Sequence, residues 1–207
     1  MFEMFKIFEI FKIISGGQSG ADLGGILFAL IYKIEHEVNT HRGFKPIRGK
    51  IPDNVKVNYV TNKLGVPGLI YRTEYNVKNS DITLIFIQKE LNKTKGSRLT
   101  ARYCLENGKP HIIIKVLKNI NIGDNKGEED EYICEYIDKN KNKKSVELKQ
   151  ILNYLYILRE DKIKGKFEIN KYIINIAGER YWNENKIVKI LEKIFGEVKE
   201  LNEVKES

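Results

Sequence analysis

The sequence predicts one α/β domain in which a mainly parallel sheet lies between two helical layers, a three-layer arrangement. Two continuous apolar runs, residues 82–87 and 111–116, are typical of strands buried on both faces, and segments of helical spacing alternate with them. The 207 residues, 42% of them hydrophobic, are sufficient for one core. The charged fraction of 31% and the mean hydropathy of −0.40 exclude a membrane protein, and the apolar content excludes a disordered chain.

The first expected strand, residues 11–14, leads into a glycine-rich turn that reads SGGQSG over residues 15–20, and an apolar helix follows. Glycine lets the backbone approach a ligand, and the N–H groups of such a turn and of the first helical turn point at one spot that suits a phosphate. The spacing matches neither the dinucleotide fingerprint nor the P-loop. The alternative is that the turn is only a tight connection and binds no ligand. For Asp22, the alternative is that it only interacts favourably with the dipole of the helix, since it lies in the first helical turn.

A basic segment with Gly and Pro, residues 42–52, follows a second strand that is expected near His41. Lys45, Arg48 and Lys50 are candidates for facing the same anion, with a solvated loop as the equal alternative. Of these three cations we assign Lys45 to the site.

The mixed apolar spacing of residues 69–79 predicts a helix that carries Arg72, Glu74 and Asn76 near its start and middle. Asp81 directly precedes the next strand. Arg72 is placed where a strand-end site would use a cation. Glu74 and Asp81 are the candidates for a general acid or base if the site is catalytic.

A second turn that opens a helix follows the strand at 82–87, and the helix is expected over residues 97–107. Ser97 either caps this helix or contacts a ligand oxygen. Ligands of open α/β sheets lie at the carboxyl ends of strands. This turn, with Gly96 and Thr100, therefore predicts one pocket together with the SGGQSG turn.

Residues 119–166 are interpreted as an insertion before the last strand, because the stretch is polar and mixed in charge. We expect part of it to be mobile and a helix over residues 145–158. The α/β pattern resumes with a strand at 172–177, which ends in a turn that carries Gly178 and Arg180. A closing helix follows this turn.

The first twelve residues repeat one triplet, MFE-MFK-IFE-IFK, whose charges interrupt any secretory signal. We interpret them as an extension that feeds the first strand; a segment that binds a partner or a membrane surface is the alternative. The expected organisation is a repetitive leader at 1–12, a Rossmann-like ligand-binding domain at 13–118 and 167–196, the insertion at 119–166, and a polar tail at 197–207.

The net charge of +8 first suggests nucleic acid. Only seven of the 36 basic residues are Arg, however, and Arg makes the bidentate and stacked contacts of nucleic-acid readers. The composition therefore argues against nucleic acid and supports only general attraction of phosphate. The two Cys and three His lack metal-ligand spacing, so we expect buried free thiols, no metal site, and a reducing compartment such as the cytoplasm.

Four motifs resemble, in order, the family described as putative molybdenum carrier proteins, a circularly permuted YpsA-like branch of the SLOG and lysine-decarboxylase-like superfamily. They are SGGQSGAD at 15–22, YRTEYNVKNSDITLI at 71–85, GSRLT at 96–100 with ENGKP at 106–110, and INIAGER at 174–180. The corresponding motifs of the family are roughly SGGQTGVD, RTxxNVxDSDGTLI, GGTxLT with GKP, and LNVAGPR. The resemblance implies a Rossmann-like fold that holds molybdenum cofactor or a nucleotide-like phosphorylated ligand.

The chain departs from this pattern at several positions, and a family loop that resembles CPKGRxAEDGxIP is shortened to residues 45–52 without its acidic pair. Lys95 stands where GGT has its first Gly, Ile82 stands where DSDGT has its Gly, and Glu179 stands where AGPR has Pro. The related phosphoribohydrolases carry a PGGxGTxxE motif whose Glu assists glycosidic cleavage, and no such Glu follows Gly96. The resemblance thus favours a binding or carrier protein without membrane partners, and it leaves a homo-oligomer open. The alternatives are a phosphoribohydrolase-like nucleotide-processing enzyme or a binder of a nucleotide-derived signal, with nucleic-acid binding less favoured.

The predicted ligand-binding residues come from the glycine-rich turn, the basic loop, the two helix starts and the last strand end. They are Gly16, Gly17, Gln18, Ser19, Gly20, Asp22, Lys45, Arg72, Asn76, Gly96, Ser97, Thr100, Gly178 and Arg180. We expect Gly17→Asp to abolish ligand binding and to leave the fold intact, since it places a side chain and a negative charge at the anion site.

Overall fold

The structure, a computed structural model, describes residues 9–41, 50–60, 68–117, 131–151 and 171–204. Within this part of the chain, eight strands form one sheet in the order β3-β2-β1-β8-β4-β5-β6-β7. The strands are β1 (Glu9–Ser15), β2 (Glu35–Thr40), β3 (Val57–Tyr59), β4 (Ile82–Ile87), β5 (His111–Leu117), β6 (Glu131–Ile137), β7 (Lys143–Val146) and β8 (Lys171–Gly178). The helices are α1 (Ala21–Ile31), α2 (Leu69–Lys78), α3 (Lys95–Glu106) and α5 (Glu184–Val204), with short 3-10 helices η1 (Leu91–Lys93) and η2 (Leu148–Gln150).

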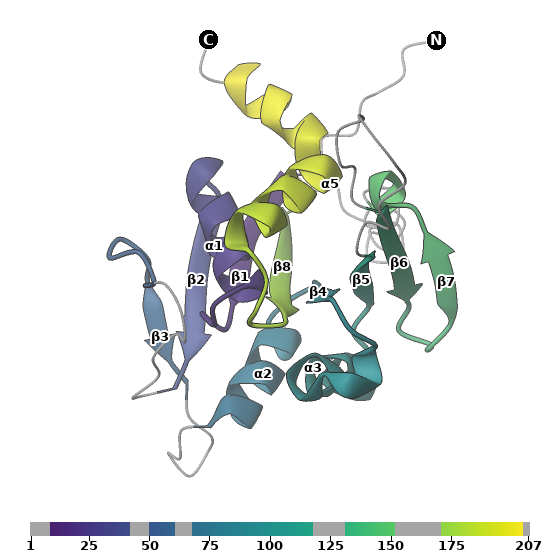
Figure 1. Ribbon diagram of the computed structural model, residues 1–207. Helices are drawn as coiled ribbons and strands as arrows, with labels where there is room; N and C mark the ends of the chain where they lie inside the picture. Colours follow the sequence, from purple (N-terminus) through teal and green to yellow (C-terminus); the bar gives the residue numbers. More distant parts are fainter. Residues whose placement is uncertain (1–8, 42–49, 61–67, 118–130, 152–170, 205–207) are drawn as a thin grey trace, which may run out of the picture.

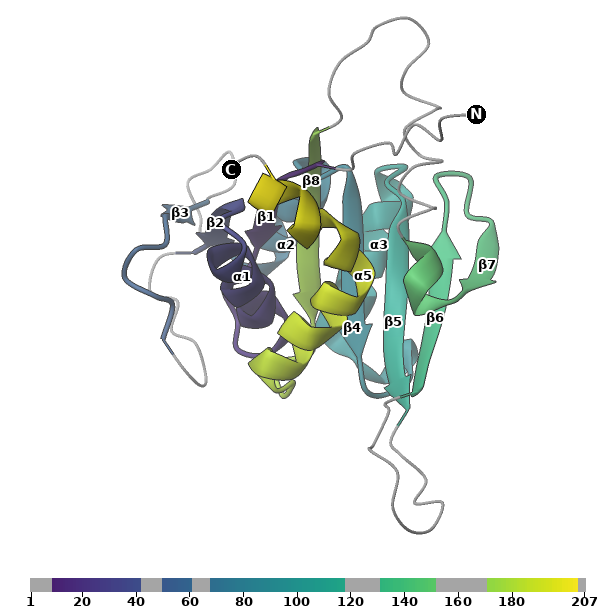
Figure 2. The same ribbon diagram turned by 90° about the horizontal axis from the view of Figure 1, so that it is seen from above.

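The strands from β3 to β5 in this order run parallel, and β6 and β7 continue the sheet antiparallel. Helices α1 and α5 cover one face of the sheet, and α2 and α3 cover the other (Figures 1 and 2). This arrangement confirms the predicted α/β fold with a mainly parallel sheet. Among the described residues, no helix combines the length and the apolar character that crossing a membrane requires.

The region after β5 differs from the expectation, because it extends the sheet. Residues 145–146, where a helix was expected to begin, are the end of β7. Val146 is 6% exposed and lies opposite Cys134 of β6, so burial in a strand pair overrides the helical spacing of the segment. Residues 152–158 of that expected helix lie outside the described residues. The boundaries of the insertion stay a prediction.

The start of α3 also differs from the expectation. The helix begins at Lys95, with Thr94 in the N-cap position, so Ser97 lies inside its first turn. Because Thr94 holds the N-cap position, the alternative that Ser97 caps this helix is wrong. The shift by one turn places Gly96 among the first residues of the helix.

Close packing fixes α1 against the sheet and against α5. A Cβ on Gly25 would lie 2.7 Å from the Cβ of Ile176, and a Cβ on Gly24 would lie 2.5 Å from the Cβ of Ile187. Two adjacent glycines thus let the helix approach β8 and α5 more closely than any other residues would allow. The N-terminus of α1 is held at the carboxyl ends of β1 and β8 as a result.

Hydrogen bonds join three loops at this edge of the sheet. The backbone N–H of Ala21 donates to the carbonyl of Glu179 over 3.4 Å, and the N–H of Glu179 donates to the carbonyl of Phe86 over 3.0 Å. The N–H of Gly20 donates to Oε1 of Glu184 over 2.9 Å. The ends of β1, β4 and β8 therefore form one connected platform.

Candidate functional site

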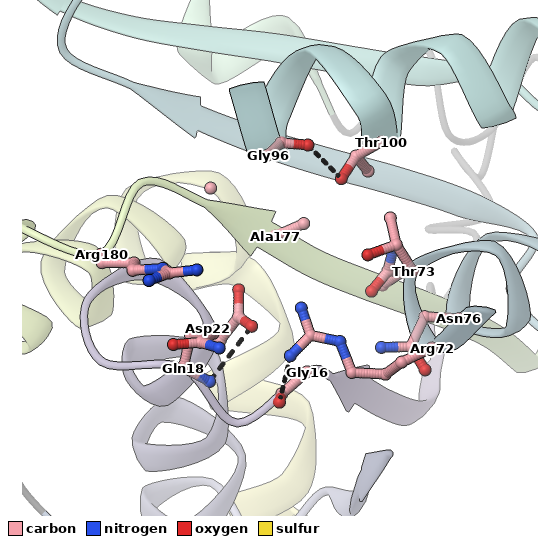
Figure 3. Close-up of a pocket in the computed structure, with 12 residues that line it drawn as sticks. Gly16, Gln18, Asp22, Arg72, Thr73, Asn76, Gly96, Thr100, Ala177 and Arg180 are labelled. Atoms are coloured by element: carbon pink, nitrogen blue, oxygen red, sulfur yellow. Dashed lines mark hydrogen bonds between the residues drawn. The ribbon is translucent and has the colours of Figure 1, made fainter. Parts of the chain in front are cut away.

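A pocket lies at this platform, between the glycine-rich turn, α2 and the start of α3 (Figure 3). It contains about 490 Å³ of space, its open mouth included. The described residues that line it are Gly16, Gln18, Asp22, Arg72, Thr73, Asn76, Gly96, Thr100, Asn175, Ala177, Gly178 and Arg180. The fold thus brings together nine of the residues predicted from the sequence and adds Thr73, Asn175 and Ala177.

Arg72 reaches from α2 to the glycine-rich turn. It is 9% exposed, and its Nη1 donates to the carbonyl of Gly16 over 2.8 Å. A Cβ on Gly16 would lie 2.6 Å from Nη1 of Arg72 and 2.7 Å from Oδ2 of Asp22. Only glycine at this position therefore leaves room for both charged groups.

Asp22 is the acidic residue of the lining, and it is 5% exposed. Its Oδ2 accepts the backbone N–H of Gln18 over 3.2 Å. Burial raises the pKa of Asp22 to about 6, although the charge of Arg72 and hydrogen bonds from the Gln18 and Gly16 backbone act in the opposite direction. The carboxyl group is thus a titratable part of the site near neutral pH.

The backbone N–H groups of the glycine-rich turn have partners inside the protein. The N–H of Gly17 donates to Oγ of Ser15 over 3.2 Å, and those of Gln18 and Gly20 donate to the carboxylates of Asp22 and Glu184. The expectation that these donors are open to a phosphate is therefore not met at these positions. The carboxylate of Asp22 takes the place that an anion would occupy beside the turn.

The start of α3 offers an alternative set of donors. Gly96 and Thr100 line the pocket, and the hydroxyl of Thr100 donates to the carbonyl of Gly96 over 3.2 Å. The first N–H groups of a helix have no partner within it, and at α3 they belong to Lys95, Gly96 and Ser97. A Cβ on Gly96 would meet nothing within 4 Å, so space is open in front of this helix end. Arg180 lies across the pocket from it (Figure 3).

The four other predicted binding residues that the structure describes do not line the pocket. Gly17 has φ +71°, and a Cβ there would lie 2.5 Å from Cγ1 of Val38. The expectation that Gly17→Asp leaves the fold intact is therefore wrong, because the side chain would strain the backbone and enter apolar packing. Ser19, Gly20 and Ser97 are also absent from the lining, and Lys45 lies outside the described residues.

The two carboxylates considered for catalysis are engaged elsewhere. Glu74 forms a 2.6 Å ion pair with Lys78 on α2. Oδ2 of Asp81 accepts the N–H of Ile173 over 3.0 Å, where β4 and β8 begin. That end of the sheet is opposite to the carboxyl ends of the strands, and neither residue lines the pocket.

Four lining residues carry a buried polar atom without a hydrogen-bond partner. These atoms are Oε1 of Gln18, Nε of Arg72, Oδ1 of Asn76 and Oδ1 of Asn175. Sequence reasoning missed Asn175, although one signal was present: it is a polar residue in an apolar strand that ends at a glycine turn. Buried polar atoms are nearly always paired in folded proteins, so these four atoms are exceptions within the lining.

Comparison with known proteins assigns the family. The model of the circularly permutated YpsA SLOG family matches residues 13–147. The chain belongs to this family. A solved structure named putative molybdenum carrier protein, from Syntrophus aciditrophicus SB, aligns with a TM-score of 0.58 and 24% identity over 91% of this chain and 94% of that one. It supports the fold of this SLOG protein.

A second solved structure, the C-terminal domain of coenzyme A biosynthesis bifunctional protein CoaBC, aligns with a TM-score of 0.35 and 12% identity over 74% of this chain and 100% of that one. No curated protein matches the chain.

Two departures of this SLOG chain from the family motifs have structural explanations. Glu179 stands in place of Pro, and its Oε1 accepts the N–H groups of Gln88 and Lys89 over 3.1 and 3.3 Å. The side chain thereby ties the β8 turn to the loop after β4. Ile82 stands in place of Gly, is fully buried, and pairs with Ile174 of β8.

Proposed function

We propose that this protein binds a small phosphorylated molecule in the pocket at the strand ends, as a binding or carrier protein. The observation that carries the proposal is the arrangement of Arg72, Arg180 and the N-terminus of α3 around one hollow. Guanidinium groups and helix N-termini are the two protein features that suit phosphate best. Belonging to the SLOG family is consistent with this role.

Charge supports the same proposal. The lining contains two Arg side chains and one carboxyl group, and the whole chain carries +8. An anion entering the pocket therefore meets an attractive field from the site and from the protein around it. Because the N–H groups of the glycine-rich turn already have partners, we assign the phosphate to the α3 side of the pocket.

The chemistry of the lining bears on the type of ligand. Its polar side chains are those of Asn, Gln, Thr, Arg and one Asp, and no group of three or more His, Cys, Asp or Glu that could hold a metal occurs among the described residues. The molybdenum cofactor, suggested by the name of the structural relative, would be held here through its phosphate and organic part. A nucleotide-like ligand would use the same groups.

An enzymatic role is the less favoured function. Glu74 and Asp81 lie outside the pocket lining, and Oδ2 of Asp22 already accepts a hydrogen bond from the turn. Release of free base from nucleoside monophosphates, lost in Asp22→Asn and retained in Glu74→Gln, would favour an enzyme over a carrier.

The test is mass spectrometry of small molecules released from the purified protein, combined with calorimetric titration of ribose 5-phosphate. Arg180→Ala is the test variant, and Arg102→Ala is its matched control, since Arg102 pairs with Glu106 on the surface of α3. We expect ribose 5-phosphate to bind the wild type and Arg102→Ala, and to bind Arg180→Ala roughly tenfold more weakly, as for loss of one charge-assisted hydrogen bond. No released phosphorylated compound and no heat of binding would contradict the proposal.

A further inference from the structure

The carboxyl group of Asp22 lies between the two arginines of the pocket. Figure 3 shows it with Arg72 on one side and Arg180 on the other. The charges of both arginines act on the carboxyl group, that of Arg72 more strongly. Its Oδ2 accepts the N–H of Gln18, and its other oxygen points away from Gln18 and Gly16 (Figure 3). Asp22 is therefore bound to the glycine-rich turn and also belongs to the pocket lining.

The neighbouring elements add no second carboxyl group to the described lining. Glu184 of α5 accepts an N–H of the glycine-rich turn, and Glu179 accepts N–H groups of the loop after β4. The start of α3 contributes Gly96 and Thr100, and neither is charged. The N-terminus of a helix favours negative charge nearby. Asp22 is thus the one acidic group of the described lining, in surroundings that are otherwise cationic.

An anion in this pocket meets the carboxyl group as well as the arginines. A phosphate attracted by Arg72 and Arg180 comes close to Asp22, because the same two side chains flank it. Two like charges in one site of low dielectric oppose each other's ionisation, and a proton on one of them removes the repulsion. Burial raises the pKa of Asp22 to about 6, so little further change is needed for it to hold a proton near neutral pH.

We propose that Asp22 takes up one proton from the solvent when a phosphate dianion binds in this pocket; the inference rests on the proposed phosphate-binding function. The neutral carboxyl group does not repel the phosphate, and its O–H becomes a hydrogen-bond donor for a phosphate oxygen. Ligand affinity therefore depends on pH. Above about pH 7 the free protein carries Asp22 mostly ionised, so each further pH unit lowers the affinity about tenfold.

The experiment is calorimetric titration of the full chain with ribose 5-phosphate at about pH 7 and about pH 8, where the ligand is itself mostly a dianion. Titrations in two phosphate-free buffers that differ in ionisation enthalpy measure the proton uptake. We expect about one proton taken up per ligand bound and an affinity that falls about tenfold between the two pH values. Binding without proton uptake and with equal affinity at both pH values would overturn the inference and leave the proposed function standing. No binding at either pH would overturn both.

A pair of carboxyl-to-amide variants assigns the proton. Asp22→Asn gives a neutral group of nearly the same shape, and Glu74→Gln is the matched control, because Glu74 pairs with Lys78 on α2 outside the pocket lining. At about pH 8 we expect Asp22→Asn to bind ribose 5-phosphate about tenfold or more tightly than the wild type and without proton uptake, and Glu74→Gln to behave as the wild type.

Thermal unfolding at the same pH checks that both variants are folded, and the proton uptake of the wild type decides the inference independently of them. Proton uptake that persists in Asp22→Asn, or weaker binding by this variant than by the wild type at about pH 8, would contradict the assignment to Asp22.

Discussion

The two faces of the sheet differ in what they place under their helices. The face under α1 and α5 is packed with apolar side chains such as Ile13, Ile174 and Ile176, all fully buried. The face under α2 and α3 instead carries a row of polar residues in register, Asn175 beside Thr83 and Thr83 beside His111. Asn175 and Ile176 are adjacent in β8, so their side chains lie on opposite faces of the sheet.

The polar row is buried as deeply as the apolar face. Burial lowers the pKa of His111 to about 4 and raises that of the Cys104 thiol, which is hydrogen-bonded to Thr83, to about 12. These groups are therefore neutral at physiological pH. The comparison indicates that the face under α1 and α5 carries the larger apolar cluster, while the face under α2 and α3 combines a smaller one, which includes Ile85 and Ile113, with this polar row.

The largest expected effect is a difference in stability between substitutions of two adjacent residues of β8, Ile176 and Asn175. Ile176→Ala should lower the free energy of unfolding by about 2–5 kcal/mol, because it leaves a cavity under α1. Asn175→Leu should change it by less than about 1 kcal/mol, because the amide that it removes is only partly paired. Denaturant unfolding of both variants measures the difference. Equal losses in the free energy of unfolding would contradict the distinction between the two faces of the sheet.

Asp22 should give the polar side a pH-dependent stability. Its pKa is raised by burial from 3.8 to about 6, so the folded state binds the proton more tightly than the unfolded state. The contribution is complete below about pH 4 and is lost as the pH rises to about 6, a change on the order of 3 kcal/mol. Unfolding curves at several pH values for the wild type and Asp22→Asn isolate this effect, and parallel pH profiles would contradict it.

A smaller effect on stability, coupled to a loss of binding, is expected for Gly16→Ala. The added methyl group would displace Arg72 and Asp22, which crowd this position, at a cost of about 1–3 kcal/mol. Gly68→Ala is the control, because a Cβ there meets nothing within 4 Å. Thermal unfolding and ribose 5-phosphate titration test the pair. Unchanged binding by Gly16→Ala would place the anion away from Arg72.

The sequence predicted the features that depend on neighbouring residues. Continuous apolar runs identified β4 and β5, and the spacing of residues 69–79 identified α2 with Arg72 and Asn76. The general rule that ligands bind at strand ends placed these side chains near the glycine-rich turn. Local pattern and topology were sufficient for the fold and for most of the pocket lining.

The sequence could not predict features that depend on distant partners. The N–H of Gly20 donates to Glu184, which lies 164 residues further along the chain. Nothing in the sequence indicated this hydrogen bond, so the N–H group was predicted to be available to an anion. Residues 145–146, where a helix was expected to begin, belong to β7 because β6 pairs with them. Asn175 could not be assigned to the pocket from the sequence, because its place in the lining depends on how β8 lies beside β4 and under α2 and α3.

Amide hydrogen exchange with and without ribose 5-phosphate tests the central claim most directly, since it reports which face of the sheet responds to the ligand. We expect slower exchange at the first N–H groups of α3, Lys95 to Ser97, with no change along α1 and α5. Slower exchange along α1 and α5 with no change at α3 would contradict it.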